Sequence, residues 1–357
     1  MNLPKSNSNL EKKPNHIELR LKSNERSLLS GRSDTSPQGL RATSQEYQMP
    51  TPIFYNPKQN VIGVSSYSPS ASKPARFAEL MAHYDFRSYG NGFSPVTPVE
   101  KEDLYRVHRR DHVDNVFSGK EPNGFNNHDP RVPTSCLWTI GSLLCAARWA
   151  MANPILPVCA PVSGFHHAGY SWGSESFCTF NGLMVVAAII ISEDPKARIC
   201  VIDADAHEGN GTSDILQHFP SLDRQVLHFT AGKYFHGDNP RDDALEFQAW
   251  LHSAIAETNA FQPDLVLYQA GADSHVDDDL KGGYLTSHQM QQRDRAVFRG
   301  IKAPLVFDLA GGYQKPTDGT IFTDPVLQLH RTTITEANAS VAHRIELLKD
   351  ASFRGSV

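Results

Sequence analysis

Side chains capable of chemistry are concentrated in the segment from Val201 to Gly211, which reads VIDADAHEGNG. Asp203, Asp205 and His207 alternate there with alanines, directly after an apolar run. In an extended chain, residues two apart lie on the same side, so Asp205 and His207 can both reach one ion, and Asp203 lies on that side too. Catalytic zinc commonly has three protein ligands and an open fourth position. The spacing indicates a metal-ligand segment, in which Asp203 serves a second ion or orients a histidine; taken alone, it also fits strand-end caps.

Three further segments offer partners for such a metal site. His166 and His167 are adjacent in SGFHHAG, Asp273 lies in GADSHVDDD, and Tyr313 follows two glycines in AGGYQ. Histidine can take a proton from water and return it to a leaving amine. A tyrosine hydroxyl can donate to an oxyanion, and glycines allow close backbone approach. Each feature alone fits a polar loop or a core tyrosine, but together they predict a hydrolytic site.

The elements that position these residues can be read from the apolar pattern. Five short apolar runs, typical of strands buried on both faces, occupy residues 155–162, 197–204, 225–229, 264–270 and 303–310. Helix-like segments lie between or before them at 139–153, 181–192, 242–258 and 286–300. This alternation predicts an α/β domain with a mainly parallel sheet and helices on both faces. Because ligands bind beyond the carboxyl ends of such strands, the polar groups that follow four of the strands are expected at one edge.

Two details of the predicted helices can be tested. Leu245, Trp250 and Leu251 are expected to form the apolar stripe of the third helix. Thr286 or Ser287 is expected to cap the fourth helix.

The composition restricts the class of protein. The chain has 357 residues, 39% of them hydrophobic, and a net charge of -5, which argues against a general nucleic-acid binder. It contains neither a run of eighteen apolar residues nor a secretory signal pattern, so no membrane partner is expected. Five single cysteines without CxxC pairs indicate free thiols in a reducing cytoplasm: Cys136, Cys145, Cys159, Cys178 and Cys200. The predicted location is therefore cytoplasmic.

The chain divides into a tail and one domain. Residues 1–50 are rich in Ser and Asn and lack apolar periodicity, so they are predicted to be a disordered N-terminal tail. The alternative is a targeting segment of an exported effector. Residues 51–350, which show no internal repeat or linker, are predicted to form a single catalytic domain. The sequence does not indicate an oligomeric state.

Five blocks of sequence resemble, in order, the motif series of the zinc-dependent histone deacetylase superfamily: APVSGFHHAGY, SFCTFNG, VIDADAHEGNGT, YQAGADSHVDDDLKGGYLT and LAGGYQ. That group includes acetylpolyamine amidohydrolases and bacterial histone deacetylase-like proteins with the arginase-type α/β fold. The resemblance extends from about Pro52 to about His330. It implies hydrolysis of an N-acyl amide, with acetyl-lysine in a protein or peptide, or an acetylated polyamine, as the substrate.

The resemblance also implies which residues hold metal ions. Asp205, His207 and Asp273 match the ligands of one catalytic zinc ion, although Fe(II) or Co(II) could occupy the same ligands. Main-chain carbonyls around Asp203, Asp205 and His207 match a structural potassium site of the family.

Roles in proton transfer follow from the same resemblance. His167 matches the general base that later acts as the acid, with His166 beside it as an electrostatic partner. Asp203 would orient His166, and Asn210 would contact His167. Tyr313 would polarise the acyl carbonyl and hold the oxyanion.

The substrate channel carries the main departure from the family pattern. Phe177 and Leu280 match positions that line the acyl-lysine channel. Ser176 stands where the family usually has glycine, and it is expected to narrow the channel or to alter a backbone contact with the substrate.

Two rival functions remain open. A binuclear manganese hydrolase of the arginase type needs a further Asp two positions after the last ligand, where this chain has His275. A non-catalytic protein that binds small molecules or acts as a scaffold needs no proton shuttle, so His166, His167 and Tyr313 argue against it.

An acidic run follows the ligand Asp273. At least one of Asp277, Asp278 and Asp279 is expected to face the mouth of the site and to attract a cationic substrate. A solvated turn without functional effect is the alternative.

Overall fold

The structure, a computed structural model, describes residues 51–354 apart from 64–68, 85–92, 174–176 and 281. The side chains of residues 347–354 are not described. The predicted tail over residues 1–50 and the channel residue Ser176 therefore lie outside the described residues.

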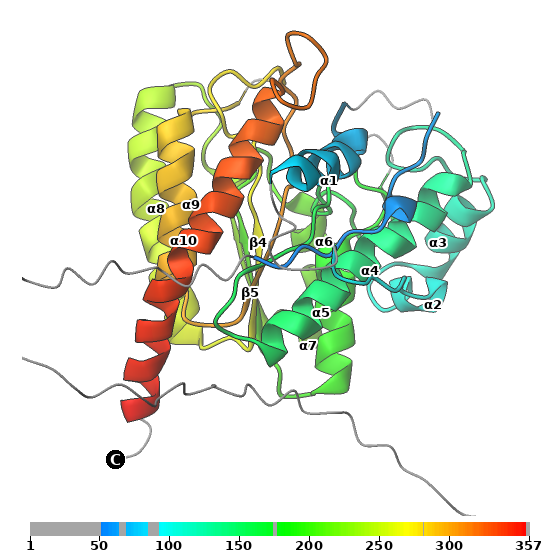
Figure 1. Ribbon diagram of the computed structural model, residues 1–357. Helices are drawn as coiled ribbons and strands as arrows, with labels where there is room; N and C mark the ends of the chain where they lie inside the picture. The colour runs from blue at the N-terminus through cyan, green and yellow to red at the C-terminus, as the bar shows by residue number, and fades with distance from the viewer. Residues whose placement is uncertain (1–50, 64–68, 85–92, 174–176, 281, 355–357) are drawn as a thin grey trace, which may run out of the picture. The chain divides into compact units, whose positions relative to one another are not determined.

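A sheet of five parallel strands forms the centre of the described part of the chain (Figure 1). The spatial order is β1-β5-β4-β2-β3. The strands are β1 (Val158–Cys159), β2 (Ile199–Asp203), β3 (Val226–Thr230), β4 (Leu265–Gln269) and β5 (Leu305–Asp308). All five predicted strands and the parallel α/β architecture are confirmed. In the register of the sheet, Asp203 at the end of β2 lies beside Thr230 of β3 and Gln269 of β4, so the carboxyl ends of these strands are level.

Helices cover both faces of this sheet (Figure 1). The helices are α1 (Lys73–His83), α2 (Lys101–Leu104), α3 (Arg110–Phe117), α4 (Arg131–Ala152), α5 (Gly182–Glu193), α6 (Asn210–His218), α7 (Pro220–Asp223), α8 (Pro240–Phe261), α9 (Ser287–Gly300) and α10 (Pro325–Arg354). Short 3₁₀ turns occur at η1 (Pro57–Gln59), η2 (Pro69–Ser72) and η4 (Ala231–Lys233). Among the described helices, none is both long enough and apolar enough to cross a membrane.

The strands contribute alternate side chains to two separate hydrophobic cores. In β2, Ile199 and Val201 pack with the core that includes α4 and α5. Cys200 and Ile202 pack on the opposite face, with the core that includes α8, α9 and α10. Since both faces are buried, the strand reads as a continuous apolar run in the sequence, as parallel strands do.

The structure tests the helix details and corrects one of them. Leu251 is buried on α8, but Leu245 is 61% exposed and does not belong to the apolar stripe. Phe247, four residues before Leu251, takes its place because helical neighbours four apart share a face. Thr286 caps α9 in a capping box with Gln289, so the first of the two proposed caps is correct.

The long helix α10 was not predicted, and one buried arginine fixes it to the rest of the domain. Arg344 is 1% exposed, and its guanidinium donates to carbonyl oxygens of the loops before β1 and β5. These acceptors are Pro154, Ile155, Ile301 and Ala303, each at 2.7 to 2.8 Å. Burial lowers the pKa of Arg344 to about 10, so it keeps its charge at neutral pH.

Replacement of Arg344 by methionine is expected to lower the free energy of unfolding by about 3 kcal/mol. The reason is that methionine fills part of the space but leaves four carbonyl groups, one buried and three partly buried, without this donor. Urea unfolding of the variant and of His343→Met, which changes an exposed neighbour on α10, measures the difference. Equal stability of the two variants would show that Arg344 does not fix α10.

Candidate active site

The three predicted metal ligands converge at the carboxyl ends of β2 and β4. One ligand atom from each of Asp205, His207 and Asp273 lies within 4.8 Å of the other two. His207 Nδ1 is 2.8 Å from Asp273 Oδ2 and 3.1 Å from Asp205 Oδ1. Both carboxylates are buried, whereas the His207 side chain is 34% exposed. The described residues contain no second cluster of this kind.

The electrostatics of this cluster suit a cation. Burial and the neighbouring Asp205 carboxylate raise the pKa of Asp273 to about 7. Burial opposes protonation of His207, but its hydrogen bonds to Asp205 and Asp273 raise its pKa to about 11. The cluster therefore favours a positive charge between its two carboxylates. Two carboxylates and one imidazole, with one side open, match the donor set of a catalytic zinc site.

Backbone groups hold the two carboxylates in place. Asp205 Oδ2 accepts a hydrogen bond from the Gly311 N–H at 2.8 Å, and Asp273 Oδ1 accepts one from Ala206 N–H at 3.2 Å. A Cβ at Gly311 would overlap the Asp273 carboxylate. Because Gly311 has no side chain, the backbone before Tyr313 can lie against the Asp205 and Asp273 carboxylates, which is the close approach that the glycine pair predicted.

The two adjacent histidines have different partners and different charge states. His166 Nδ1 donates to Asp203 Oδ2 at 2.6 Å, and His167 Nδ1 donates to Asn210 Oδ1 at 2.9 Å. Burial disfavours the charge of His166, but the Asp203 and Asp205 carboxylates raise its pKa to about 9. Burial and the neighbouring His166 lower the pKa of His167 to about 4. At neutral pH, His167 is therefore the uncharged imidazole and can accept a proton.

The hydrogen bonds of Asp203 distinguish between its two predicted roles. Besides His166, the carboxylate accepts from Gln269 Nε2 at 3.0 Å and from the Asp205 N–H at 3.2 Å. The Thr230 hydroxyl lies 3.4 Å from its second oxygen. Both oxygens of Asp203 are therefore engaged within the protein, and these contacts favour the predicted orienting role over that of a ligand of a second ion.

Tyr313 lies next to His207 of the metal-ligand cluster. Its ring centroid is 6.3 Å from that of His207 and 5.8 Å from that of Phe177. The side chain is 7% exposed, and burial, together with Asp205 and Asp273, holds its pKa well above the usual range. The phenol therefore keeps its proton and is available as a hydrogen-bond donor.

Two buried ionisable side chains fix the Tyr313 loop: Lys73, which sequence reasoning did not assign to the site, and Asp278, which it expected near the mouth. Lys73 Nζ donates to the carbonyl oxygens of Ala310 and Gly311. Asp278 accepts from the Tyr313 N–H at 2.8 Å and from the Leu280 N–H at 3.1 Å. Nothing in the sequence marks Lys73, which lies 238 residues from Gly311 along the chain.

The acidic run is split between the surface and the interior. Asp278 is 5% exposed, so it belongs to the interior and not to the mouth. The Asp277 and Asp279 side chains are 81% and 43% exposed, and Lys315 Nζ lies 3.8 Å from Asp279. The predicted attraction of a cationic substrate therefore concerns only Asp277 and Asp279, whereas Asp278 bonds to the backbone of Tyr313 and Leu280.

The surroundings of His275 argue against a second metal ion. Its Nε2 donates to Ser287 Oγ at 2.9 Å, and its Nδ1 accepts from Gln314 Nε2 at 2.8 Å. With both ring nitrogens engaged, His275 cannot replace the carboxylate that an arginase-type binuclear site requires at this position.

The predicted channel residues have separate environments. Phe177 packs against Tyr313 and has a φ of 61°, a strained conformation for a residue with a large side chain. Leu280 is 46% exposed, on the loop that Asp278 connects to Tyr313.

Comparison with known proteins gives the family. Residues 70–243 and 238–327 match the profile of the histone deacetylase domain. The chain belongs to the histone deacetylase family. It is therefore a hydrolase of the deacetylase class, and zinc is the metal typical of that family.

Several relatives are similar over much of this domain. The acetoin utilization protein AcuC of Bacillus subtilis (strain 168) is 28% identical over 260 residues, which cover 60% of this chain and 67% of AcuC. Histone deacetylase 5 of Arabidopsis thaliana is 25% identical over 258 residues, covering 60% of this chain and 39% of the relative. The crystal structure of the HDA15 HD domain has a TM-score of 0.62 at 18% identity, covering 82% of this chain and 90% of that domain. This last likeness confirms the fold.

Proposed function

We propose that this chain is a zinc-dependent hydrolase of N-acyl amides that acts on acetyl-lysine in proteins or peptides, or on acetylated polyamines. The observation that carries the proposal is that a cluster of metal-ligand residues lies beside a neutral histidine and a protonated tyrosine. Asp205, His207 and Asp273 would hold the ion. When bound, zinc would polarise the acyl carbonyl and make water acidic enough to attack at neutral pH. The proposal treats residues 51–350 as one cytoplasmic catalytic domain.

In this proposal the two histidines have different roles, His167 in proton transfer and His166 in charge stabilisation. His167 Nε2 takes a proton from the attacking water and later gives it to the leaving amine. The hydrogen bond from Nδ1 to Asn210 supports this role, because it leaves the lone pair of Nε2 free. His166, kept protonated by Asp203, contributes positive charge next to the oxyanion that develops.

Tyr313 completes the proposed mechanism. Its hydroxyl donates a hydrogen bond to the acyl oxygen as negative charge develops there. Phe177 and Leu280 are proposed to line the channel for the acylated side chain, and Ser176 to modify it. A potassium ion near the main chain of Asp203 stays a prediction.

The proposal is tested with zinc-loaded protein and a panel of acetyl-lysine peptides and acetylated polyamines. Turnover of at least one amide, inhibition by a hydroxamate and one zinc ion per chain are expected. Absence of turnover across the panel would favour a binding or scaffold protein. Two metal ions per chain would instead favour an arginase-type hydrolase.

Replacement of Asp278 by asparagine is expected to lower kcat by about tenfold to a hundredfold, with metal content retained. The reason is that an amide cannot accept from the N–H groups of both Tyr313 and Leu280 through two oxygens. Hydrogen bonds to charged groups contribute about 1.5 to 3 kcal/mol, which corresponds to this range of rate.

Asp277→Asn is the matched control because Asp277 is the exposed neighbour on the same loop. It is expected to leave kcat unchanged and to raise KM only for cationic substrates at low salt. Equal kcat values for the Asp278→Asn and Asp277→Asn variants would show that Asp278 does not position Tyr313.

A further inference from the structure

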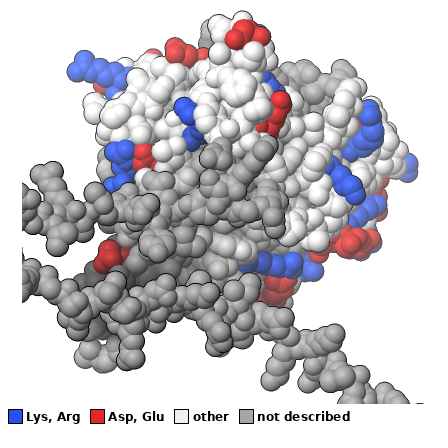
Figure 2. All heavy atoms as spheres, viewed as in Figure 1, with Lys and Arg blue, Asp and Glu red and all other residues white. Residues whose placement is uncertain are grey.

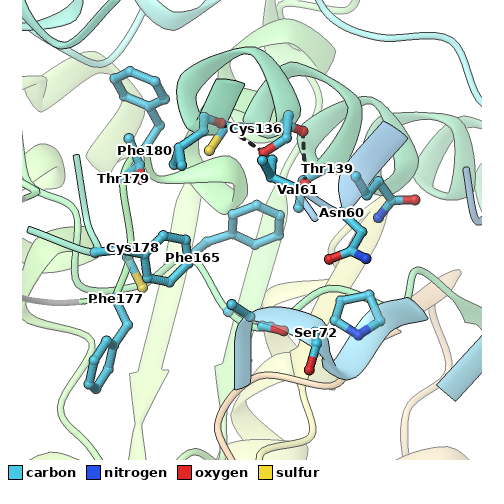
Figure 3. A pocket seen from close by; sticks show the side chains of 18 of the residues that line it. Asn60, Val61, Ser72, Cys136, Thr139, Phe165, Phe177, Cys178, Thr179 and Phe180 are labelled. Carbon is cyan, nitrogen blue, oxygen red and sulfur yellow. Dashed lines mark hydrogen bonds between the residues drawn. The ribbon is translucent and has the colours of Figure 1, made fainter. Parts of the chain in front are cut away.

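A cavity of about 440 Å³ lies beside the catalytic centre, and the proposed mechanism does not use it. Its walls come from five parts of the domain: η1 and the segment after it, η2 with the start of α1, the loop before α4, the first half of α4, and the segments on either side of the histidine pair. Figure 3 shows side chains from these parts around the cavity, among them Val61, Ser72, Cys136, Thr139 and Phe180. Figure 2 shows one face of the molecule, on which charged side chains of both signs are scattered among uncharged residues.

Three residues of the cavity wall are neighbours of the reacting groups, in the chain or in space. Phe165, in its wall, directly precedes His166 in the chain. Phe177, also in its wall, packs against the ring of Tyr313. The thiol of Cys178, the next wall residue, lies by the backbone of His167 and within the electrostatic influence of Asp205. An acyl group held between Tyr313 and His167 would therefore have this cavity beside it.

The chemistry of the walls excludes a charged occupant. None of the described residues that line the cavity is Asp, Glu, Lys, Arg or His. Burial raises the pKa of both wall thiols, Cys136 and Cys178, to about 12, so they are neutral as well. Placing an ammonium group or a carboxylate here would require a charge to lose its hydration without a partner.

The remaining wall surface is largely apolar. Four phenylalanines contribute to it: Phe125, Phe165, Phe177 and Phe180. Several wall hydroxyls already bond to the protein's own backbone. Thr139 donates to Ser135 O at 3.0 Å, Ser135 to Val132 O at 2.8 Å, and Ser163 to Ser70 O at 2.6 Å. A neutral hydrocarbon chain suits such a surface better than a polar ligand.

We propose that this cavity binds the acyl chain of the substrate, and that the protein hydrolyses amides of lysine with medium-length acyl chains, such as octanoyl-lysine, in preference to acetyl-lysine. This proposal rests on the proposed hydrolytic function. The oxygen of water joins the acyl carbon and the C–N bond breaks. The acyl group leaves as a fatty carboxylate, and the amine leaves with the proton that His167 returns.

The expected preference follows from burial of methylene groups. Each methylene that enters an apolar cavity stabilises the bound state enough for about a fourfold gain in kcat/KM. Octanoyl has about six more methylenes than acetyl, and burial of only two of them already gives more than tenfold, so we expect kcat/KM to rise from acetyl through butanoyl to octanoyl by at least about tenfold. An added amine at the end of the acyl chain should remove the gain because it would place a charge in the cavity.

The test compares one lysine peptide carrying acetyl, butanoyl or octanoyl groups, with full-length zinc-loaded protein. Thr139→Phe fills part of the cavity, and Thr134→Phe is the matched control on α4. Both threonines donate to the carbonyl four residues earlier, but Thr134 is exposed and does not line the cavity. The ratio of kcat/KM for octanoyl to that for acetyl is expected to fall about tenfold in Thr139→Phe and to stay unchanged in Thr134→Phe.

Binding of octanamide, measured by calorimetry, gives a second readout that does not depend on turnover. Octanamide should bind the original protein and Thr134→Phe, and bind Thr139→Phe at least tenfold more weakly. If Thr139→Phe does not fold, Cys136→Met fills the same cavity and takes its place. Faster turnover of acetyl than of octanoyl peptide, or an equal ratio in the two phenylalanine variants, overturns the acyl-chain proposal alone. Absence of turnover with every amide overturns the hydrolytic function as well.

Discussion

Replacement of Tyr313 by phenylalanine is expected to lower kcat by roughly a hundredfold or more, the usual loss when one oxyanion donor is removed. The phenol of Tyr313 is buried and keeps its proton, so it can donate to the acyl oxygen throughout the reaction. Phenylalanine keeps the packing of this ring against Phe177, whose centroid is 5.8 Å away. The change therefore removes the hydroxyl and little else.

The measurement is kcat and KM for one acylated peptide, together with the zinc content of the variant. Tyr105→Phe is a suitable control because it removes the hydroxyl of the residue after α2, which bonds to Asp114 of α3. We expect kcat to fall in Tyr313→Phe only, with KM and zinc content close to the original values. A Tyr313→Phe variant with unchanged kcat would mean that another group stabilises the oxyanion.

The sheet and the metal cluster were predictable because both follow from local sequence. Each strand is buried on both faces, so each appears as a short apolar run. Parallel strands end at one edge, so the polar residues after β2, β4 and β5 had to come together. The pairing of His166 with Asp203 and of His167 with Asn210 came from the family resemblance, and the hydrogen bonds at 2.6 and 2.9 Å agree with it.

The parts that escaped prediction depend on contacts between distant segments. Lys73 reaches the Tyr313 loop from α1, and Arg344 reaches the loops before β1 and β5 from α10. A buried lysine or arginine looks like an ordinary surface residue until its partners are known. The cavity is likewise formed by several separate segments, and no single one of them shows it. Leu245 was misassigned because the register of α8 was not fixed by its sequence alone.

Replacement of Asp273 by asparagine is expected to abolish zinc binding at stoichiometric concentrations and to remove activity with it. The variant loses one of three ligands, and the remaining Asp205 and His207 do not make a complete site. Zinc content after dialysis and turnover of the preferred amide measure both effects. Asp223→Asn is a suitable control because Asp223 is an exposed aspartate on α7, which precedes the amino end of β3. An Asp273→Asn variant with full zinc content and full turnover would contradict the assignment of this ligand.

Thermal unfolding should separate loss of the ligand from general damage. In the metal-free protein, Asp273 and Asp205 are two carboxylates buried next to one another, so neutralising Asp273 removes a repulsion. Metal-free Asp273→Asn is therefore expected to unfold at the same temperature as the metal-free original protein, or at a higher one. Zinc at about a hundred times its dissociation constant should stabilise the original protein by about 2.7 kcal/mol and should leave the variant unchanged. A variant that is less stable than the original protein without zinc, yet gains as much from zinc, would show that Asp273 supports the fold and does not bind the metal.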